Sequence, residues 1–290
     1  MSKKLIKFDQ ELKKICKLAL IEDKAQNDIT SDLIVKKNSN IYFKIVARQE
    51  IILCGVNAVQ ICFDHLTKLK KFKNIFLGLQ FSAKDGDKIK AGEAIVKGFG
   101  DAKLIFAAER VILNLLQHLS GIATLTNQFV KILNNKKIKI LDTRKTLPGL
   151  RALQKQAVLI GGGKNHRFNL SDMILIKDNH IAAAKDITKA ILAAKKSKKL
   201  KIEIECDNFD QVVKAVNSKP DVIMLDNMNP KQIEKCTKLI RSTSKEILIE
   251  ISGGINLKNI KNFRNLDIDF ISIGSLTHSA AAVDIGLDIN

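Results

Sequence analysis

The stretch Ile174-Leu175-Ile176-Lys177-Asp178-Asn179-His180 is a short apolar run that ends abruptly in polar and charged residues. A run of this kind predicts a short β-strand. An amphipathic segment follows it over residues 187–195, and the next apolar run begins at residue 201. The order strand, helix, strand at this spacing predicts a parallel sheet with right-handed crossovers.

The same alternation recurs on both sides of that stretch. A long helical pattern over residues 104–133 precedes the first strand, and a further amphipathic helix is predicted over 230–241. A regular β/α barrel has eight strands, so six clear strands predict an open, incomplete β/α barrel. The six predicted strands are residues 138–141, 173–176, 201–205, 222–225, 247–251 and 270–273.

A different pattern fills the chain before residue 105. An opening helix is predicted over residues 5–21 and a second helix over 57–66. Strands with a covering helix predict a small α+β domain, joined to the barrel in an overall α/β fold. Turns are expected over 84–93, where Asp-Gly and Ala-Gly supply positive φ angles. The strands predicted in this domain are residues 41–48, 51–54 and 75–81.

Composition limits the class of protein. The chain has 290 residues, of which 46% are apolar and 27% charged, as in globular proteins. No apolar run reaches the roughly 18 residues of a membrane span, and the N-terminus does not resemble a signal peptide. Five cysteines, an odd number without a C-x-x-C pair, favour a reducing cytoplasm.

The net charge of +19 first suggests a nucleic-acid or membrane partner. Only seven of the 49 basic residues are arginine, and the lysines are scattered over many segments. With one Tyr and no Trp, the chain has few aromatic side chains on which bases could stack. We therefore expect a lysine-rich solvated surface and no nucleic-acid function.

Polar residues follow the strands of the predicted barrel at the point where each strand ends. The carboxyl ends of barrel strands meet at one mouth, where catalytic sites are built. Residues far apart in the sequence are therefore expected to meet there. The groups are Asp142 to Thr146, Lys177 to His180, Glu205, Asp226 with Asn227, Ser252 to Gly254, and Gly274 with Ser275.

The first of three subsets at this mouth is basic. Four of the seven arginines lie between residues 110 and 167, a concentration that the lysine-biased composition does not explain. The planar guanidinium engages carboxylate or phosphate through two parallel hydrogen bonds, which favours a planar anionic ligand. The alternative is that these cations neutralise acidic residues inside the barrel. The subset comprises Arg144, Lys145, His166, Arg167 and Lys177.

The second subset is acidic, and the third is rich in glycine. Glu205 and Asp226 suit a hydrated Mg²⁺ that arrives with a polyphosphate, or stabilisation of a developing positive charge. Glu203 shares the strand face of Glu205, and we expect it to be a buried, structurally paired charge. Ser252-Gly253-Gly254 and Ile273-Gly274-Ser275 are typical of phosphate-binding loops, with a following helix offering its positive end.

Several strings combine these residues at a fixed spacing. They include Glu109-Arg110-Val111-Ile112-Leu113-Asn114, Asp142-Thr143-Arg144-Lys145-Thr146, Asn165-His166-Arg167, Glu203-Ile204-Glu205 and Gly274-Ser275-Leu276-Thr277-His278-Ser279. Over nearly its whole length the chain closely resembles the quinolinate phosphoribosyltransferases, also called carboxylating nicotinate-nucleotide pyrophosphorylases. The T-R-K-T and N-H-R strings at their mutual spacing are highly specific.

The resemblance implies a fold and an activity. The fold would be an N-terminal α/β sandwich domain over residues 1–105, an open barrel over 106–275, and a segment 276–290 that returns to the N-terminal domain. The enzyme would transfer a phosphoribosyl group from phosphoribosyl pyrophosphate to quinolinate with loss of CO₂, giving nicotinate mononucleotide for NAD biosynthesis. It would be cytoplasmic, use Mg²⁺, and form a homodimer with shared active sites, with a hexamer as a compatible larger assembly.

The resemblance also implies roles for individual residues. Arg144, His166, Arg167 and Lys177 would receive the quinolinate carboxylates, and Thr143 would join them in substrate binding. Arg110 would come from the neighbouring subunit. Lys145, Glu205 and Asp226 would be catalytic on the ribose, pyrophosphate and Mg²⁺ side. No residue would be a direct metal ligand by itself, since Mg²⁺ would be held with the pyrophosphate, with Glu205 and Asp226 as the candidate contacts. Ser252, Gly253, Gly254, Ile273, Gly274 and Ser275 would hold the 5′-phosphate.

Two alternative functions remain open on the sequence alone. A phosphosugar lyase of the aldolase type would use Lys177 as a Schiff-base nucleophile. A catalytically idle anion-binding protein would be expected if the paralogous family member linked to molybdenum transport were the closer relative. Turnover of quinolinate separates both from the transferase.

Overall fold

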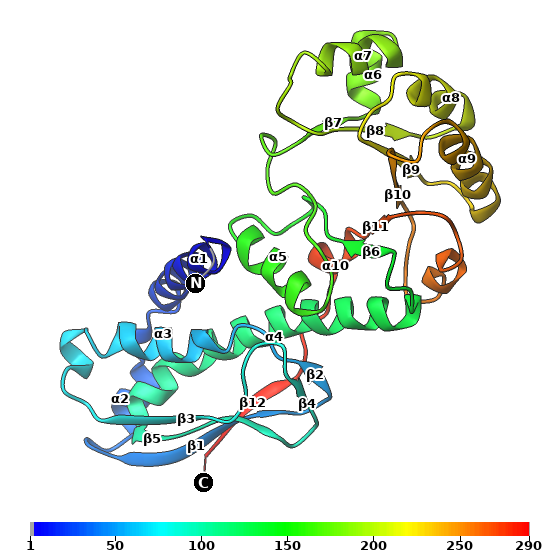
Figure 1. The fold of residues 1–290 in the computed structure, drawn as a ribbon. Coiled ribbons are helices and arrows are strands. Elements are labelled where there is room, and N and C mark those ends of the chain that lie inside the picture. The colour runs from blue at the N-terminus through cyan, green and yellow to red at the C-terminus, as the bar shows by residue number, and fades with distance from the viewer. Residues whose placement is uncertain (1–2, 290) are drawn as a thin grey trace. The chain divides into compact units, whose positions relative to one another are not determined.

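The computed structural model describes residues 3–289, so Met1, Ser2 and Asn290 of the predicted terminal segments lie outside the described residues (Figure 1). The chain forms two compact units. Unit 1 contains residues up to 127 together with 146–162 and the segment from 277 onward, and unit 2 contains residues 128–145 and 163–276.

The division into units differs from a single boundary near residue 105. Helix α4 (Ala102–Leu133) belongs to unit 1 as far as Asn127, and α5 (Arg151–Ile160) belongs to unit 1 as well. The sequence boundary was drawn where the residue pattern changes. Compact units depend instead on contacts between residues far apart in the chain, which a local pattern does not contain.

Unit 1 is built on a four-stranded sheet in the order β12-β1-β5-β3. Its neighbouring strands are antiparallel throughout. The strands are β1 (Asn40–Ala47), β3 (Leu77–Phe81), β5 (Ala94–Asp101) and β12 (Ile285–Ile289), and β2 (Ile51–Ile52) pairs separately with β4 (Lys88–Ile89).

The sequence pattern did not predict β4, β5 or β12. Strand β5 contains Gly98 and Gly100, and glycine normally weakens a strand prediction. In the sheet, a Cβ on Gly98 would lie 2.4 Å from the ring of Phe43 on the neighbouring strand, so only glycine fits there. Strand β12 pairs with β1 between Ile285 and Ala47, which joins the end of the chain to this sheet.

Helices predicted in unit 1 are present with small shifts at their ends. The predicted helix over 57–66 is α3 (Asn57–Leu66), and the opening helix is α1 (Lys3–Glu22). The short helix α2 (Ile29–Ile34) is capped by Asp28, whose side chain accepts from the backbone N–H of Ser31. Single 3₁₀ turns are η1 (Ala25–Asn27) and η2 (Lys70–Phe72).

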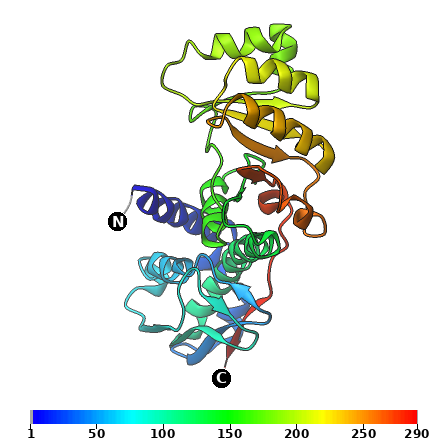
Figure 2. The ribbon, with the colours of Figure 1, turned by 45° about the vertical axis from the view of Figure 1, so that its right-hand side comes forward.

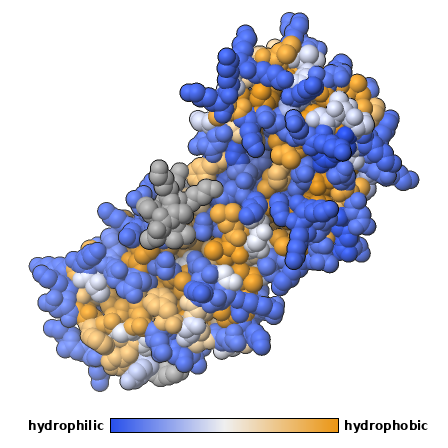
Figure 3. Space-filling model, viewed as in Figure 1, coloured by the Kyte–Doolittle hydropathy of each residue, from blue (hydrophilic) through white to orange (hydrophobic). Residues whose placement is uncertain are grey.

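Unit 1 leaves several apolar side chains in contact with solvent, and apolar surface is visible on it (Figure 3). Three of them lie on α2, where Ile29, Leu33 and Ile34 are 73%, 81% and 75% exposed. Hydrophilic side chains cover much of the rest of the face in that view, in keeping with the scattered lysines. Among the described residues, no helix is long and apolar enough to span a membrane.

Unit 2 is built on six parallel strands in the order β6-β11-β10-β9-β8-β7. Within the described residues the two end strands, β6 and β7, do not pair with each other. The predicted open β/α barrel is thereby confirmed. The strands are β6 (Lys139–Leu141), β7 (Ile174–Ile176), β8 (Ile202–Cys206), β9 (Val222–Asp226), β10 (Leu248–Ser252) and β11 (Phe270–Ser272).

Helices cover the strands of unit 2 on one face, where α7 contacts β7 and β8 and α8 contacts β8 and β9 (Figure 2). Asn208 and Asn229 cap α8 and α9 by accepting from the backbone N–H groups of Gln211 and Gln232. The helices are α6 (Asp178–Ala184), α7 (Ile187–Ala194), α8 (Phe209–Asn217) and α9 (Pro230–Thr243), with a 3₁₀ turn η3 (Ile260–Phe263). The short helix α10 (Ser275–His278) begins in unit 2 and ends in unit 1.

Candidate active site

The carboxyl ends of the unit 2 strands lie along one edge of the sheet because all six run in the same direction. In the register of β9 and β10, Asp226 is directly opposite Ser252, and Glu205 of β8 is opposite Met224 of β9. The sequence pattern predicts candidate functional residues at these strand ends. The sheet therefore brings most of the predicted set to a common edge.

A buried aspartate holds together two loops of this edge. Asp142 follows β6 and is 0% exposed. Its Oδ1 accepts from the backbone N–H of His166 at 2.9 Å, and its Oδ2 accepts from the side-chain amide of Asn165 at 2.5 Å. Lys164 also forms a parallel bridge with Leu141 of β6. The sequence motif that contains Asp142 does not by itself predict this role, and the signal for it is the position of Asp142 directly before a basic loop.

The basic residues of this edge include two neighbouring guanidinium groups. Burial and the nearby charge of Arg144 lower the pKa of Arg167, while Glu203 and Asp172 oppose that shift. Arg167 Nη1 donates to the carbonyl of Met173 at 3.2 Å, which fixes the side chain. Two cations held near each other in a partly buried site favour an anionic ligand between them.

A lysine and a carboxylate form an ion pair at the same sheet edge. Lys177 precedes α6, and its Nζ is 2.5 Å from Glu205 Oε2. The Lys177 side chain is 44% exposed and that of Glu205 is 11% exposed. Thr143 Oγ1 accepts from the backbone N–H of Lys145 at 3.0 Å, so its hydroxyl shapes the turn that presents Lys145.

Three carboxylates form a possible cation site. Glu205, Asp207 and Asp226 each offer an oxygen, and these atoms lie within 4.8 Å of one another. Carboxylate oxygens are the ligands that Mg²⁺ prefers, and a site that is partly exposed leaves room for retained water, so the group fits that ion. Glu205 and Asp226 are predicted from the strand ends, whereas Asp207 is not, because it lies two residues beyond the predicted strand end.

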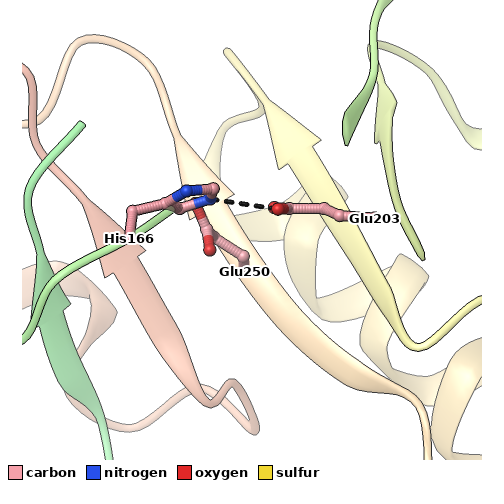
Figure 4. A group of neighbouring side chains, drawn as sticks. All are labelled: His166, Glu203 and Glu250. Carbon is pink, nitrogen blue, oxygen red and sulfur yellow. Dashed lines mark ion pairs between the residues drawn. The ribbon is translucent and has the colours of Figure 1, made fainter. Parts of the chain in front are cut away.

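Two glutamates and a histidine meet in the interior of unit 2 (Figure 4). His166 Nε2 is 3.0 Å from Glu203 Oε2 and 3.7 Å from Glu250 Oε1. Burial raises the pKa of Glu203 to about 7 and that of Glu250 to about 8, and the charge of Glu203 adds to the second shift. The sequence predicted a buried Glu203 but missed Glu250, whose signal was a glutamate between two isoleucines in β10.

The glycine-containing strand ends have the backbone expected of an anion cradle. Gly253 and Gly254 have φ angles of 92° and 63°, and Asn227 on the neighbouring strand end has 54°. A Cβ on Gly253 would lie 2.1 Å from Asn227 Oδ1, so this position requires glycine, whereas Gly254 faces open space. Successive N–H groups in such a conformation form a concave anion site.

Two expectations about this cradle need correction. Ile273 is 2% exposed and its backbone N–H donates to the carbonyl of Leu141, so it is not a donor toward phosphate. The helical segments that follow the two loops are short, because α10 spans only Ser275–His278 and the 3₁₀ turn η3 begins at Ile260. A helix dipole is therefore a small contribution, and the backbone N–H groups themselves must supply the attraction.

The four clustered arginines are divided between the units. Arg144 and Arg167 belong to unit 2, whereas Arg110 on α4 and Arg151 on α5 belong to unit 1. Arg151 Nε donates to Thr146 Oγ1 at 3.0 Å. Arg110 is exposed, and within residues 3–289 its guanidinium has no ion-pair or hydrogen-bond partner.

Two family models together match almost the whole chain. The N-terminal domain of quinolinate phosphoribosyl transferase matches residues 28–120, and the C-terminal domain matches residues 122–288.

Known proteins are similar over their full length. The probable carboxylating nicotinate-nucleotide pyrophosphorylase of Methanocaldococcus jannaschii is 41% identical, over 95% of this chain and 96% of the relative. That of Bacillus subtilis is also 41% identical, over 96% and 93%. The solved nicotinate-nucleotide pyrophosphorylase of Ehrlichia chaffeensis has a TM-score of 0.88 at 40% identity, and the match covers 96% of this chain and 98% of that one.

Proposed function

This chain belongs to the quinolinate phosphoribosyltransferase family, and from this premise we propose how its residues carry out the activity of a carboxylating nicotinate-nucleotide pyrophosphorylase in NAD biosynthesis. The reaction joins C1 of phosphoribosyl pyrophosphate to the nitrogen of quinolinate and releases pyrophosphate and CO₂. The main support for the proposal is that one edge of the unit 2 sheet carries two neighbouring guanidinium groups, a lysine and a cluster of carboxylates.

We assign the quinolinate side of the site to Arg144, Arg167 and Lys177. Quinolinate is a planar dianion, and guanidinium groups bind carboxylates through two parallel hydrogen bonds. The lowered pKa of Arg167 in the presence of Arg144 supports this assignment, because an anion between the two cations would relieve their repulsion. His166 belongs to the same group by resemblance, although its Nε2 is directed toward Glu203.

We assign the phosphoribosyl side to the carboxylates and to Lys145. Breaking the bond to pyrophosphate gives the ribose ring oxocarbenium character, and Glu205 and Asp226 can stabilise this positive charge electrostatically. Lys145 is exposed, and its positive charge supports attraction of the pyrophosphate anion. Glu205, Asp207 and Asp226 are the residues that would hold Mg²⁺, whose contribution would be to neutralise the pyrophosphate charge.

Decarboxylation follows from the bond that the site forms. After ribosylation the pyridine nitrogen is cationic, so the ring accepts the electron pair of the bond to the adjacent carboxylate as CO₂ leaves. A proton from solvent then takes the place of CO₂ on that carbon. The protein therefore needs no electron sink of its own, and its task is to orient and desolvate the dianion.

The Schiff-base alternative for Lys177 has no structural support. A nucleophilic lysine needs a neutral amine, which requires burial or a neighbouring cation that disfavours the charged form. The Nζ of Lys177 instead forms an ion pair with the carboxylate of Glu205, so the nitrogen that a Schiff base would need is already engaged. We therefore assign Lys177 to anion binding.

A dimer and a cytoplasmic location complete the proposal. The exposed apolar residues of α2 support an assembly in which unit 1 meets a second copy. Arg110 supports it as well, because its guanidinium is exposed and has no partner within residues 3–289. The five cysteines are all buried free thiols, which supports a reducing compartment.

The direct test is an assay with both substrates. We expect CO₂ and pyrophosphate to be released in equal amounts only when quinolinate and phosphoribosyl pyrophosphate are both present, with loss of turnover on chelation of divalent cations. Nicotinate in place of quinolinate is the matched control, because it lacks the carboxylate that leaves. Pyrophosphate release without CO₂ from quinolinate would contradict the proposed reaction.

The glycine cradle gives a paired prediction. We expect Gly253→Ala to raise KM for phosphoribosyl pyrophosphate strongly, because its Cβ would collide with Asn227 and displace the phosphate-binding backbone. At Gly254 a Cβ would face open space, so Gly254→Ala should lower stability only by the left-handed backbone strain of about 1 kcal/mol. Steady-state kinetics with quinolinate held saturating measures both. Equal effects of the two substitutions would contradict the assignment of Gly253 to the phosphate site.

A further inference from the structure

Two glutamate side chains lie buried beside His166 without a task in the proposed reaction (Figure 4). Glu203 comes from β8 and Glu250 from β10, and they are 0% and 2% exposed. Carboxyl groups are rarely buried so completely without a specific partner, because desolvation is costly. Their nearest basic group is the imidazole of His166.

The hydrogen bond at Nδ1 of His166 determines which nitrogen carries the proton. The backbone N–H of Arg167 donates to Nδ1 across 2.7 Å, so Nδ1 offers a lone pair and carries no proton. In a neutral imidazole the proton is then on Nε2, the nitrogen that faces Glu203. Nε2 therefore carries its proton close to the two carboxyl groups, although neither oxygen of Glu203 accepts a hydrogen bond from the described residues, and Nδ1 turns its lone pair toward the loop of Arg167.

One histidine and two glutamates are also a possible donor set for a metal ion. A metal at this place would take the lone pair of Nε2, and the imidazole proton would move to Nδ1. That proton would face the N–H of Arg167, donor against donor. The positive charges of Arg167 and Lys177 also act on Glu203 and disfavour a further cation. The arrangement fits a proton on Nε2.

We propose that Glu203 and Glu250 are positioning residues for quinolinate binding, because they hold His166 in the tautomer that anchors the backbone of Arg167. The ligand atoms of His166, Glu203 and Glu250 lie within 4.8 Å of one another, and His166 Nε2 is 3.0 Å from Glu203 Oε2. On its other side His166 accepts at Nδ1 from the backbone N–H of Arg167, whose guanidinium is the proposed carboxylate receptor. This inference rests on the proposed function, because the ligand that it serves is quinolinate.

Positioning and purely structural roles predict different results when the carboxyl groups are removed. Replacing buried ionisable groups by apolar ones of similar size is often neutral or stabilising, because the desolvation cost disappears. Methionine is unbranched like glutamate and adapts to irregular cores. We expect the double variant E203M/E250M to melt at or above the wild-type temperature. Its KM for quinolinate should rise about tenfold to a hundredfold, the cost of misplaced substrate-positioning groups, with KM for phosphoribosyl pyrophosphate unchanged.

Conservative and control variants sharpen this test. Glu250→Gln keeps an amide N–H that can donate to Glu203, so it should restore the quinolinate KM that Glu250→Met loses. Thr237→Val removes a buried hydroxyl that donates to the carbonyl of Glu234 on α9, and it should change neither KM. An unchanged quinolinate KM in the double variant, or a loss that glutamine does not restore, overturns the positioning role.

A spectroscopic measurement on the wild-type protein does not depend on any variant folding. Long-range ¹H–¹⁵N spectra of ¹⁵N-histidine-labelled protein should show His166 as the neutral Nε2–H tautomer, identified among the five histidines by its loss in His166→Gln. An Nδ1–H tautomer, an imidazolium, or a signal that changes on chelation overturns the inference. Failure of the wild-type protein to bind quinolinate in calorimetry would instead contradict the proposed function.

Discussion

Arg144→Ala and Arg167→Ala should each weaken quinolinate binding by about 2 to 5 kcal/mol while changing phosphoribosyl pyrophosphate binding much less, because each removes a guanidinium that pairs with a carboxylate in a water-poor site. The lowered pKa of Arg167, caused by burial and by Arg144, shows that the two cations already repel each other. A dianion between them gains from both, and the loss of either leaves one carboxylate poorly paired.

Calorimetric titration with each ligand separately decides this prediction. The matched control is Arg241→Ala, because Arg241 lies in unit 2 but its guanidinium binds Asp267 and Asp269 beside α9. That variant should keep its affinity for both ligands. Equal losses for the two ligands in Arg144→Ala or Arg167→Ala would mean that the basic residues form a general anion trap.

The strand ends of unit 2 were predictable because their signal is local. Each predicted strand agrees with the observed one to within about a residue at either end, and polar side chains such as Lys177 and Asp226 mark where an apolar run stops. The direction of parallel strands then places these side chains at one edge without further information. Most residues that lie at the strand ends of the candidate site can therefore be predicted from the sequence.

The interior carboxyl pair was only half predictable. Glu203 was recognised because it lies two residues before Glu205 and so shares its strand face. Glu250 also lies between two isoleucines, Ile249 and Ile251. The residue at the end of its strand is a serine and not a second carboxylate, so the sequence gives no comparable signal for a buried glutamate there. That β8 and β10 bring the two glutamates together follows from the curvature of the sheet, which no residue pattern states.

Parts of unit 1 were not predictable because their reasons lie on other strands. Gly98 is needed in β5 by the ring of Phe43 in β1, so the residue that weakened the strand prediction is the one that the sheet requires. Strand β12 is short, and its own residues give only a weak strand signal. It is stabilised by its antiparallel hydrogen bonds with β1.

The largest effect is expected for Arg110 in combination with Lys177. Arg110→Ala and Lys177→Ala should each be nearly inactive alone, yet a mixture of the two proteins should regain activity. Arg110 belongs to unit 1 and Lys177 to unit 2, and we propose that the arginine serves the site of a partner subunit. In a mixed dimer one site would then carry both lesions and the other neither.

The expected recovery follows from symmetry. In a freely exchanged equimolar mixture about half of the dimers are mixed, and each has one intact site of two, so activity should approach about a quarter of wild type. The matched control mixes Arg144→Ala with Lys177→Ala, because both residues belong to unit 2 and serve one site. Every site in that mixture keeps a lesion, so activity should not return.

No recovery in the first mixture, after subunit exchange has been verified by mass spectrometry, would assign Arg110 to its own subunit's site or to none. Recovery in both mixtures would mean that unit 2 itself is shared between subunits, because only then could Arg144 and Lys177 complement each other.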